Sequence, residues 1–373
     1  MDKIEPDSVS TAVARAGAAD LTAQICRGIG AAGGWVPFDK FMDWALYTPG
    51  LGYYSRGDRQ FGLMPASGSD FVTAPELSPL FGRALAAQVR QGLEASASHE
   101  VWEFGAGSGA LAVSLLAELG DVVGRYTIVD VSGALRARQQ ATLTAFGERV
   151  RWIDRLPDGM QGVVVGNEVL DAMPAKLLTF DGRQWCERGV ALYDGAFTFA
   201  DQPTALCPPG EMVWAPGSVT EIHPQALAFI TTLAERLERG LAIFIDYGFP
   251  QAEYYHPQRS SGTLMCHQGH RADGDPLVDV GFKDITVHLD FSAIALAAQD
   301  AGMEVAGYTS QAHFLFNCGL AALLECAGLR ERAAAHKLVA EHEMGELFKV
   351  IALARGITID PLGYLHGDRS HRL

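Results

Sequence analysis

The segment Glu103–Ala110, with the sequence EFGAGSGA, constrains the fold more than any other part of the chain. An apolar run over 101–104 precedes three glycines at alternate positions, and leucines then recur at helical spacing. This order predicts a strand, a glycine turn and a helix. Glycines let the backbone approach a ligand closely, and the N-terminus of the helix offers free N–H groups. We therefore expect a bound ligand at this turn.

Two details of the turn distinguish between ligand classes. The dinucleotide fingerprint is G-x-G-x-x-G/A, whereas the third glycine here comes one residue early, although Ala110 could take the place of the last small residue. Glu103 ends the strand, where a carboxylate would repel a pyrophosphate but suits the ammonium of a methionyl group. The pattern favours S-adenosyl-L-methionine over a dinucleotide or a purely structural turn. The candidate cofactor contacts are Glu103, Gly105, Ala106, Gly107 and Gly109.

Strands and helices alternate after this turn. Apolar runs over 126–130, 150–153, 162–165 and 241–246 read as strands, and helical patterns separate them. Such alternation predicts an α/β fold with a Rossmann-like, parallel and doubly wound sheet.

Acidic residues follow the second and third predicted strands. Asp130 ends the second, where an acid can accept both ribose hydroxyls of a nucleoside, or could instead cap the helix that begins near Ser132. Val131 beside it is a further candidate contact. Asp154 could accept the adenine amino group, or could simply be a surface acid.

The acceptor of the reaction is expected at the end of the fourth strand, because carboxyl ends of parallel strands face the ligand crevice. Asn167, Glu168 and Asp171 follow that strand and are the candidate catalytic residues. A capped helix start with solvated acids is the alternative. The chain lacks an Asn-Pro-Pro-Tyr arrangement at this point, and carboxylates suit a cationic acceptor.

Further candidates for substrate binding lie later in the chain. Asp246 and Tyr247 end the fifth strand and face the same crevice. The segment 284–291 alternates strictly, so one face is polar; it could line a substrate channel or form an exposed edge strand. That polar face consists of Asp284, Thr286, His288 and Asp290. Cys266, His267 and His270 lack standard zinc-site spacing, so we predict no metal.

The domain boundaries follow from these patterns. We expect a flexible N-terminal arm over 1–16, a helical lead-in over 17–97 that packs on the core, and the catalytic core over 98–373. The core carries an α+β insertion over 175–239, between the fourth and fifth strands, and a long loop over 247–283.

Charge and composition exclude several classes of protein. Lys and Arg total 29 against 44 Asp and Glu, a net charge of −15 that argues against binding a nucleic-acid backbone. No apolar run approaches the ~20 residues that span a bilayer. The N-terminal segment reads as neither a secretory signal nor a clear transit peptide. Six cysteines without a CxxC pair indicate reduced thiols, so we expect a cytoplasmic protein.

The chain resembles the MidA-type methyltransferases, a family that includes the mitochondrial complex I assembly-factor methyltransferase. The resemblance covers about residues 20–350 and rests on separated segments that occur in order. They are FMDWALYTPGLGYY (41–54), DFVTAPELSPLFG (70–82), EFGAGSG (103–109), LRARQQATL (135–143), NEVLDAMP (167–174), IDYG (245–248), GTL (262–264), DITVHLDF (284–291) and 311–315.

This resemblance implies a class I S-adenosyl-L-methionine fold and, from the mitochondrial member, symmetric dimethylation of an arginine on a complex I core subunit or its bacterial homologue. Glu76, in the second of these segments, becomes a further candidate for substrate binding. Two alternatives stay open: a methyltransferase for another protein residue or a small molecule, and a non-catalytic cofactor-binding assembly chaperone. The loop before Asp70 and the acid Asp130, where Glu is common, depart mildly from the family pattern.

Overall fold

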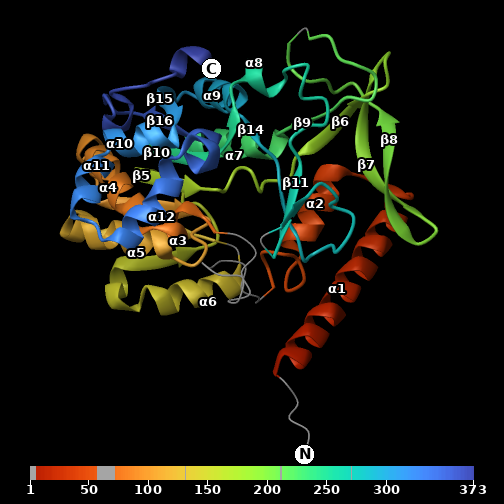
Figure 1. Cartoon of the computed structure of the whole chain (residues 1–373), viewed down its shortest axis with the longest axis horizontal. Helices are drawn as coiled ribbons and strands as arrows, with labels where there is room; N and C mark the ends of the chain where they lie inside the picture. The colour runs from red at the N-terminus through yellow and green to blue at the C-terminus, as the bar shows by residue number, and fades with distance from the viewer. Residues whose placement is uncertain (1–5, 57–71, 131, 211, 270) are drawn as a thin grey trace, which may run out of the picture.

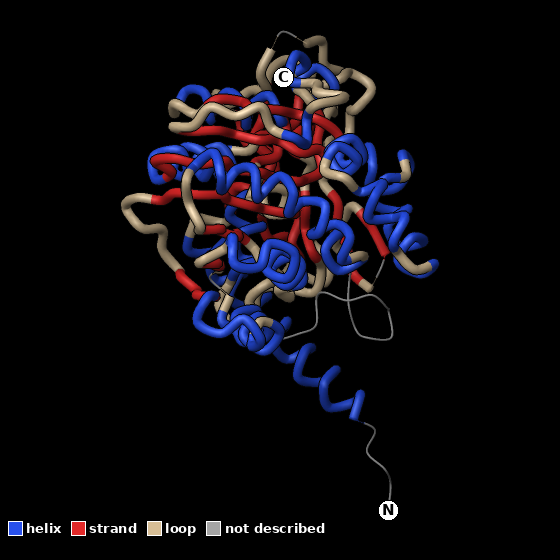
Figure 2. Tube along the Cα trace, turned by 90° about the vertical axis from the view of Figure 1, so that its left-hand side faces the viewer, coloured by secondary structure: helices blue, strands red, loops and turns tan. Residues whose placement is uncertain are grey.

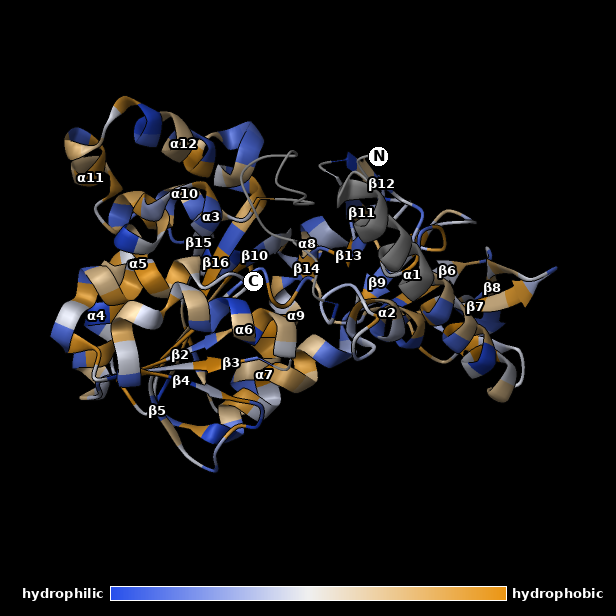
Figure 3. Cartoon of the chain, turned by 90° about the horizontal axis from the view of Figure 1, so that it is seen from below, coloured by the Kyte–Doolittle hydropathy of each residue, from blue (hydrophilic) through white to orange (hydrophobic). Residues whose placement is uncertain are grey.

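The computed structural model describes residues 6–56, 72–130, 132–210, 212–269 and 271–373. Two lobes lie side by side: a larger one built on the main sheet, and a smaller one that holds α1, α2 and β6 to β8 (Figure 3). Helix α1 (Pro6–Ala31) points its N-terminal end away from the body of the molecule in both side views (Figures 1 and 2).

The main sheet has the strand order β15-β16-β10-β5-β2-β3-β4, and β14 (Leu289–Asp290) pairs with β10. Strand β16 is antiparallel to both of its neighbours, and the other pairs are parallel. The predicted Rossmann-like α/β class is therefore confirmed. The strands are β2 (Glu100–Phe104), β3 (Arg125–Val129), β4 (Val150–Ile153), β5 (Met160–Asn167), β10 (Leu237–Phe249), β15 (Glu304–Ser310) and β16 (Phe348–Arg355).

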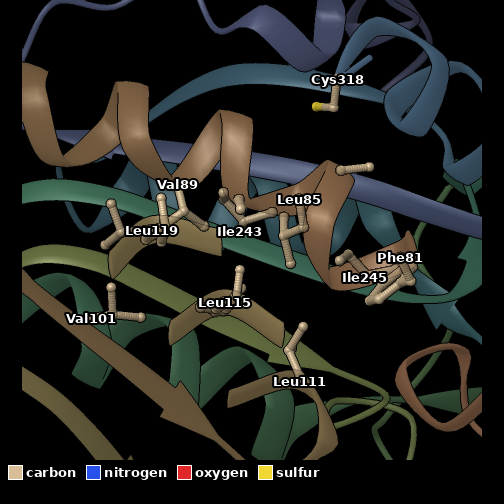
Figure 4. Close-up of a cluster of buried hydrophobic side chains, with 14 of the residues drawn as sticks. Phe81, Leu85, Val89, Val101, Leu111, Leu115, Leu119, Ile243, Ile245 and Cys318 are labelled. Atoms are coloured by element: carbon tan, nitrogen blue, oxygen red, sulfur yellow. The ribbon is translucent and has the colours of Figure 1, made fainter. Parts of the chain in front are cut away.

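Apolar helices cover both faces of this sheet, as its valine- and isoleucine-rich central strands require. On one face, α4 (Pro79–Ser96) and α5 (Ala110–Leu119) pack Val89 and Leu115 against Ile243 of β10 (Figure 4). Helices α10 (Gln311–Asn317), α11 (Leu320–Cys326) and α12 (Leu329–Val339) extend that layer. On the other face, α7 (Pro224–Arg236) and α9 (Phe291–Asp300) pack together.

The smaller lobe is assembled from three distant parts of the chain. Helices α1 and α2 (Phe38–Tyr47) and strand β1 (Trp35–Pro37) come from the N-terminal part. The second part is the antiparallel sheet of β6 (Lys176–Phe180), β7 (Trp185–Tyr193), β8 (Ala196–Pro203) and β9 (Val219–Ile222). The third is β11 (Met265–Gln268), β12 (Arg271–Asp273) and β13 (Asp284–Thr286). One apolar cluster joins all three, with Phe41, Val190 and Ile285 among its buried members.

This assembly corrects the expected boundaries of the N-terminal part. The arm expected over 1–16 is helical from Pro6 on, since proline fits the first turn of a helix and the sequence that follows is alanine-rich. The lead-in expected over 17–97 does not pack as one unit. Its first part, with α1 and α2, joins the smaller lobe, and only α3 (Ala74–Leu77) and α4 pack on the larger lobe.

The two later boundaries also change. In the insertion expected over 175–239, the four strands β6 to β9 belong to the smaller lobe, but α7 belongs to the larger one, because Ile230 and Leu233 are buried in the same cluster as Phe244. The region 247–283 is not one loop: it contains the end of β10, α8 (Gln251–Tyr254), β11 and β12.

Three chemical properties complete this description. All six cysteines are free thiols. No helix in the described part of the chain is long and apolar enough to cross a bilayer. Within the same residues, no group of three or more His, Cys, Asp or Glu side chains could hold a metal ion.

Candidate functional site

A cavity of about 510 Å³ is lined by residues of both lobes. From the larger lobe come residues at the carboxyl ends of β2, β3, β5 and β10, including Phe104, Val129 and Tyr247. The smaller lobe contributes Tyr47, Asp284 and others. Strand β2 lies between β3 and β5, where the strand order reverses, and this switch point is where doubly wound sheets bind ligands. The volume is in the roughly 300–1,000 Å³ range of small-molecule sites.

The glycine turn has the backbone shape that the sequence predicts. Gly105, Gly107 and Gly109 have φ angles of 61°, 53° and 87°, a region that side chains disfavour. Gly105, Ala106 and Gly107 line the cavity, and Gly109 stands at the N-cap of α5 outside the lining. A Cβ atom at Gly105 would lie 2.9 Å from Cγ2 of Val169, so packing also requires glycine there.

Glu103 lines the cavity and precedes the glycine turn in the chain. Its carboxylate is 2% exposed and accepts a hydrogen bond of 2.7 Å from the hydroxyl of Tyr126. Burial raises the pKa of Glu103 to about 8, against the lowering effect of that hydrogen bond. A cationic ligand group would restore the charged form. This is the electrostatic complement of a methionyl ammonium.

Asp130 lines the cavity with both carboxylate oxygens already hydrogen-bonded inside the protein. Oδ1 accepts the backbone N–H of Ser132 at 2.8 Å, and Oδ2 accepts Nε2 of Gln139 at 2.8 Å. Ser132, not Asp130, caps helix α6 (Gly133–Thr142), because its hydroxyl accepts the N–H of Leu135. Each carboxylate oxygen keeps a second lone pair for a ligand hydroxyl. The ribose contact stays a prediction.

Two further nucleoside contacts are predicted from the sequence, Val131 and Asp154. Val131 lies outside the described residues. Asp154 is exposed and does not line the cavity, so its contact with adenine also stays a prediction.

Gln139 is a buried residue of the cofactor side that sequence reasoning missed. Its Nε2 donates to the carbonyl of Gly107 at 3.1 Å as well as to Asp130, and its Oε1 accepts from Trp152 at 3.0 Å. One side chain thus connects the glycine turn, the end of β3 and strand β4. The sequence shows two adjacent glutamines, 139 and 140, and only the orientation of α6 reveals which one is buried.

Glu76 lies beside the glycine turn, since its carboxylate accepts a hydrogen bond from the hydroxyl of Ser108. Its side chain also lines the cavity. This contact ties Glu76 to the turn that the sequence predicts to bind the cofactor. Its role in substrate binding remains a prediction.

Asn167, Glu168 and Asp171 line the same cavity, next to the carboxyl end of β5. We call this part of the cavity the acceptor end, because the sequence predicts that the methyl acceptor binds there. Glu168 has a φ angle of 54°, which is rare for a residue other than glycine. Its carboxylate accepts Nδ2 of Asn167 at 2.9 Å and the backbone N–H of Ala74. Burial, together with the charge of Asp246, raises the pKa of Glu168 to about 8.

The structure corrects the expected role of Asp246. This residue is fully buried and does not line the cavity. Its oxygens accept the backbone N–H groups of Val169, Leu170 and Tyr247, at 3.2, 2.9 and 3.2 Å. Asp246 therefore holds the turn that carries Glu168 and does not face the substrate.

Asp171 shares a hydrogen bond with Asp246, and its own Oδ1 is buried without a hydrogen-bond partner among the described residues. Burial raises the pKa of Asp246 to about 7 and that of Asp171 well above its usual range. Two carboxyl groups so close share a proton, which we assign to Asp171 because Asp246 already accepts three N–H groups. The unpartnered Oδ1 leaves an acceptor for a ligand.

His288, a second predicted substrate contact, is also corrected. Tyr247 lines the cavity and stacks on His288, with ring centroids 5.7 Å apart and planes at 7°. His288 lies outside the lining, and burial lowers its pKa to about 4, so it is a neutral ring that supports Tyr247. The polar face of 284–291 divides accordingly: Asp284 and Thr286 line the cavity, whereas Asp290 caps α9. The exposed-edge interpretation is wrong, because Asp284 and Asp290 are buried.

Two tyrosines of the smaller lobe complete the acceptor end, and sequence reasoning did not assign them a role. The hydroxyl of Tyr54 donates to Oδ1 of Asp284 at 2.7 Å. The ring of Tyr47 stacks on that of Tyr54, with centroids 5.6 Å apart and planes at 25°. Both rings line the cavity. Their presence in a segment shared with a known family was the available signal.

The charge of the cavity is strongly one-sided. Six acidic side chains line it, and among the described lining residues there is no lysine or arginine. The six are Glu76, Glu103, Asp130, Glu168, Asp171 and Asp284. Such a cavity attracts cations and repels anions. A pyrophosphate-containing dinucleotide is therefore a poor fit.

Comparison with known proteins identifies the family of the chain and its cofactor. Residues 80–309, more than half of the chain, match a family model described as "Putative S-adenosyl-L-methionine-dependent methyltransferase". A crystal structure from Burkholderia thailandensis bound to S-adenosyl-homocysteine is 50% identical, has a TM-score of 0.94, and each chain covers 100% of the other.

More distant relatives carry a more specific name. The Drosophila melanogaster "Protein arginine methyltransferase NDUFAF7 homolog, mitochondrial" is 29% identical in an alignment that covers 87% of this chain and 82% of the relative. The Mus musculus "Protein arginine methyltransferase NDUFAF7, mitochondrial" is 28% identical in an alignment that covers 89% of this chain and 83% of the relative.

Proposed function

Since the chain belongs to the MidA-type family of S-adenosyl-L-methionine-dependent methyltransferases, we propose that its acceptor is an arginine side chain of a protein substrate. The observation that carries this proposal is the group of three carboxyl groups at the acceptor end of the cavity, in a lining that has no lysine or arginine among the described residues. The three belong to Glu168, Asp171 and Asp284. The acceptor's own positive charge would balance the ionised carboxylates among them.

The cofactor end of the cavity fits S-adenosyl-L-methionine in shape and charge. The positive-φ glycine turn leaves room for a ligand against the backbone, Asp130 has lone pairs for the ribose, and Glu103 suits the ammonium. When bound, this cofactor supplies an electrophilic methyl group on a positively charged sulfur. The position of the site between two lobes limits the access of water, which favours transfer of the methyl group to the intended nucleophile.

The acceptor end addresses the main difficulty of arginine methylation, which is that a guanidinium is a poor nucleophile. The acceptor nitrogen forms a bond to the methyl carbon as the carbon–sulfur bond breaks, sulfur keeps the electron pair, and the nitrogen loses one proton. We assign to Glu168, which lines this part of the cavity, the roles of gripping N–H groups of the guanidinium and of taking up that proton. Asn167 and the N–H of Ala74 hold its carboxylate in place.

Two observations favour a protein over a small molecule as the carrier of the arginine. The relatives named protein arginine methyltransferases span more than two thirds of their own length in the comparison. The chain itself carries a net charge of −15, which favours a basic partner segment.

The test is to incubate the purified chain with methyl-labelled S-adenosyl-L-methionine and lysate from cells that lack it, and then to hydrolyse the labelled species. We expect label in symmetric dimethylarginine of one protein band, and no label with the Glu168→Gln variant. Label in lysine or in a small molecule would contradict the proposed acceptor. Absence of any labelled species, with cofactor binding intact, would favour the non-catalytic chaperone instead.

A further inference from the structure

Ser132 is a buried residue of the larger lobe that also contacts the smaller one. It is 6% exposed, lines the cavity and stands at the N-cap of helix α6. Its backbone N–H donates to Oδ1 of Asp130 at 2.8 Å, where the ribose of the cofactor is predicted. Its hydroxyl donates to the backbone carbonyl of Tyr54 in the smaller lobe, also at 2.8 Å. Ser132 and Tyr54 lie 78 positions apart in the chain, so this contact joins the two lobes.

Tyr54 continues this connection to the acceptor end of the cavity. Its hydroxyl donates to Oδ1 of Asp284 at 2.7 Å, and its ring stacks on that of Tyr47. The hydroxyl of Tyr47 in turn donates to the backbone carbonyl of Ala172, in the segment that follows strand β5, at 2.9 Å. Tyr54, which Ser132 holds by its backbone, therefore contacts residues of the acceptor end with its side chain.

We propose that Ser132 is a positioning residue that couples the two ends of the cavity, so that an acceptor cation binds more tightly once the cofactor is bound. This inference rests on the proposed function and adds an order of binding to it. A ligand hydroxyl on Asp130 restrains the N-terminus of α6 and, with it, the Ser132 hydroxyl that holds Tyr54. The first ligand bears the cost of ordering this connection, and the second binds a site that is already arranged.

The experiment measures the binding of ethylguanidine, a small guanidinium probe, to the full chain with and without saturating S-adenosylhomocysteine. Calorimetry or ligand-detected NMR gives the two affinities. We expect the unmodified protein to bind ethylguanidine about tenfold more tightly when S-adenosylhomocysteine is bound. Because such coupling is reciprocal, saturating ethylguanidine should raise the affinity for S-adenosylhomocysteine by the same factor.

Two variants of Ser132 test its part in this coupling. Ser132→Ala removes the hydroxyl that holds Tyr54, and it should reduce the gain in ethylguanidine affinity to about twofold or less. The affinity for S-adenosylhomocysteine alone should stay within about threefold, because the backbone N–H that contacts Asp130 remains. Ser132→Thr keeps a hydroxyl at this position and should retain the gain.

A control is needed because Ser132 also caps α6, where its hydroxyl accepts the backbone N–H of Leu135. Ser310→Ala provides it, since Ser310 is a buried serine at the N-cap of α10 that accepts the N–H of His313 and does not line the cavity. Both alanine variants lose a helix cap and should lower the melting temperature. Only Ser132→Ala should lose the gain in ethylguanidine affinity.

The outcomes distinguish this inference from the proposed function. Ethylguanidine that binds equally or more weakly in the presence of S-adenosylhomocysteine overturns the coupling and leaves arginine as the acceptor. A gain that survives Ser132→Ala, or that Ser310→Ala also removes, overturns the role of Ser132. A protein that does not bind ethylguanidine in either condition contradicts arginine as the acceptor and this inference with it.

Discussion

The two ends of the cavity differ in how far apart along the chain their residues lie. At the cofactor end, Glu103 and Gly107 belong to one strand–turn–helix unit, and Asp130 follows the next strand. At the acceptor end, the hydrogen bond from Tyr54 to Asp284 joins residues 230 positions apart. The cofactor end is thus built from one supersecondary unit and its neighbour, whereas the acceptor end exists only after two lobes have assembled.

This difference suggests how the molecule divides its tasks. A glycine turn at a sheet switch point can bind the same cofactor in many folds, since the backbone does most of the binding. The acceptor end also depends on side chains from the smaller lobe, such as Tyr47 and Tyr54, and those can change without disturbing the sheet. We infer that substrate choice lies in the smaller lobe and that cofactor choice lies in the sheet.

The largest effect should follow a change at the cofactor end. Gly107→Val places a branched side chain at a φ of 53°, where such residues are strongly disfavoured, and on the wall of the cavity. We expect binding of S-adenosylhomocysteine to fall by about 100-fold or more, and the rise in melting temperature that the ligand causes to disappear. NAD should cause no such rise in the unmodified protein.

The matched control is Gly195→Val, because Gly195 has a φ of 81° in the turn between β7 and β8, and no atom lies within 4 Å of the position that an added Cβ would take. It should lower the melting temperature while cofactor affinity stays within about twofold. Equal loss of binding in both variants would mean that the Gly107 result reflects general destabilisation.

The second effect tests the acceptor end. Glu168→Gln keeps the shape of the side chain but replaces a charge-assisted contact with a neutral one and adds two donors. Turnover should fall by roughly 100-fold or more, a loss in the range of general acid–base contributions, with cofactor affinity nearly unchanged. Steady-state kinetics on the labelled substrate, with Glu118→Gln on the surface of α5 as the control, measures both.

Loss of cofactor binding in Glu168→Gln, with acceptor binding intact, would assign Glu168 to the cofactor end. The assignment of Glu168 to the acceptor end, on which the division of the cavity into two ends depends, would then be wrong. Asp171→Asn should show a smaller version of the loss in turnover, since its proton is shared with Asp246.

The features that the sequence predicted correctly are those whose signals lie close together along the chain. The alternation of strands and helices predicted the sheet, and the EFGAGSG turn predicted the cofactor end, because both signals are local in sequence. Asn167, Glu168 and Asp171 line the cavity as expected, since they follow a strand whose carboxyl end must face the crevice. Their catalytic role stays a prediction.

The errors concern orientation and long-range assembly. Asp246 also follows a strand, but its side chain turns toward three backbone N–H groups and away from the cavity, and a sequence does not show that choice. His288 shares a polar face with Asp284, yet the ring of Tyr247 separates it from the cavity. Tyr47 and Tyr54 were not assigned, because their partners lie in other segments.

The third effect separates direct contact from support at the cofactor end. Asp130→Ala should weaken the binding of S-adenosylhomocysteine by ~1–3 kcal/mol, which is about 5- to 150-fold in affinity, since the ribose hydroxyls would lose a charged acceptor. Asp130→Glu should be milder. Gln139→Ala removes the bridge between Gly107 and Asp130 without removing a ligand contact, and it should cost less than Asp130→Ala. Titration calorimetry on the three variants gives the order, and normal binding by Asp130→Ala would make that residue purely structural.

The smallest effect is a pH dependence of stability that both ends share. Glu103 and Glu168 each have a pKa raised to about 8 by burial, far above the ~4.3 of an unfolded glutamate. Both are protonated in the folded ligand-free protein at neutral pH, so the unfolded state binds fewer protons than the folded one. The contribution of these two groups to the free energy of unfolding is fully present below about pH 4, and it is lost as the pH rises toward 8 and beyond. The melting temperature should therefore fall by a few degrees between pH 6 and pH 8.5.

Variants and ligands can divide that fall between the two ends. Glu168→Gln and Glu103→Gln should each flatten part of it, whereas Glu118→Gln, at an exposed ion pair, should leave it unchanged. S-adenosyl-L-methionine brings an ammonium to Glu103 and should remove the part that belongs to Glu103. S-adenosylhomocysteine carries the same ammonium and should act on Glu103 in the same way. A guanidinium probe added to protein saturated with S-adenosylhomocysteine should then remove the part that belongs to Glu168, because a bound cation lowers the pKa of the carboxyl that holds it. The pH dependence of the melting temperature should be measured with each ligand in the Glu103→Gln and Glu168→Gln variants. If each ligand flattened that dependence equally in both variants, the two carboxyl groups would respond as one coupled site. The cavity would then not have two electrostatically separate ends.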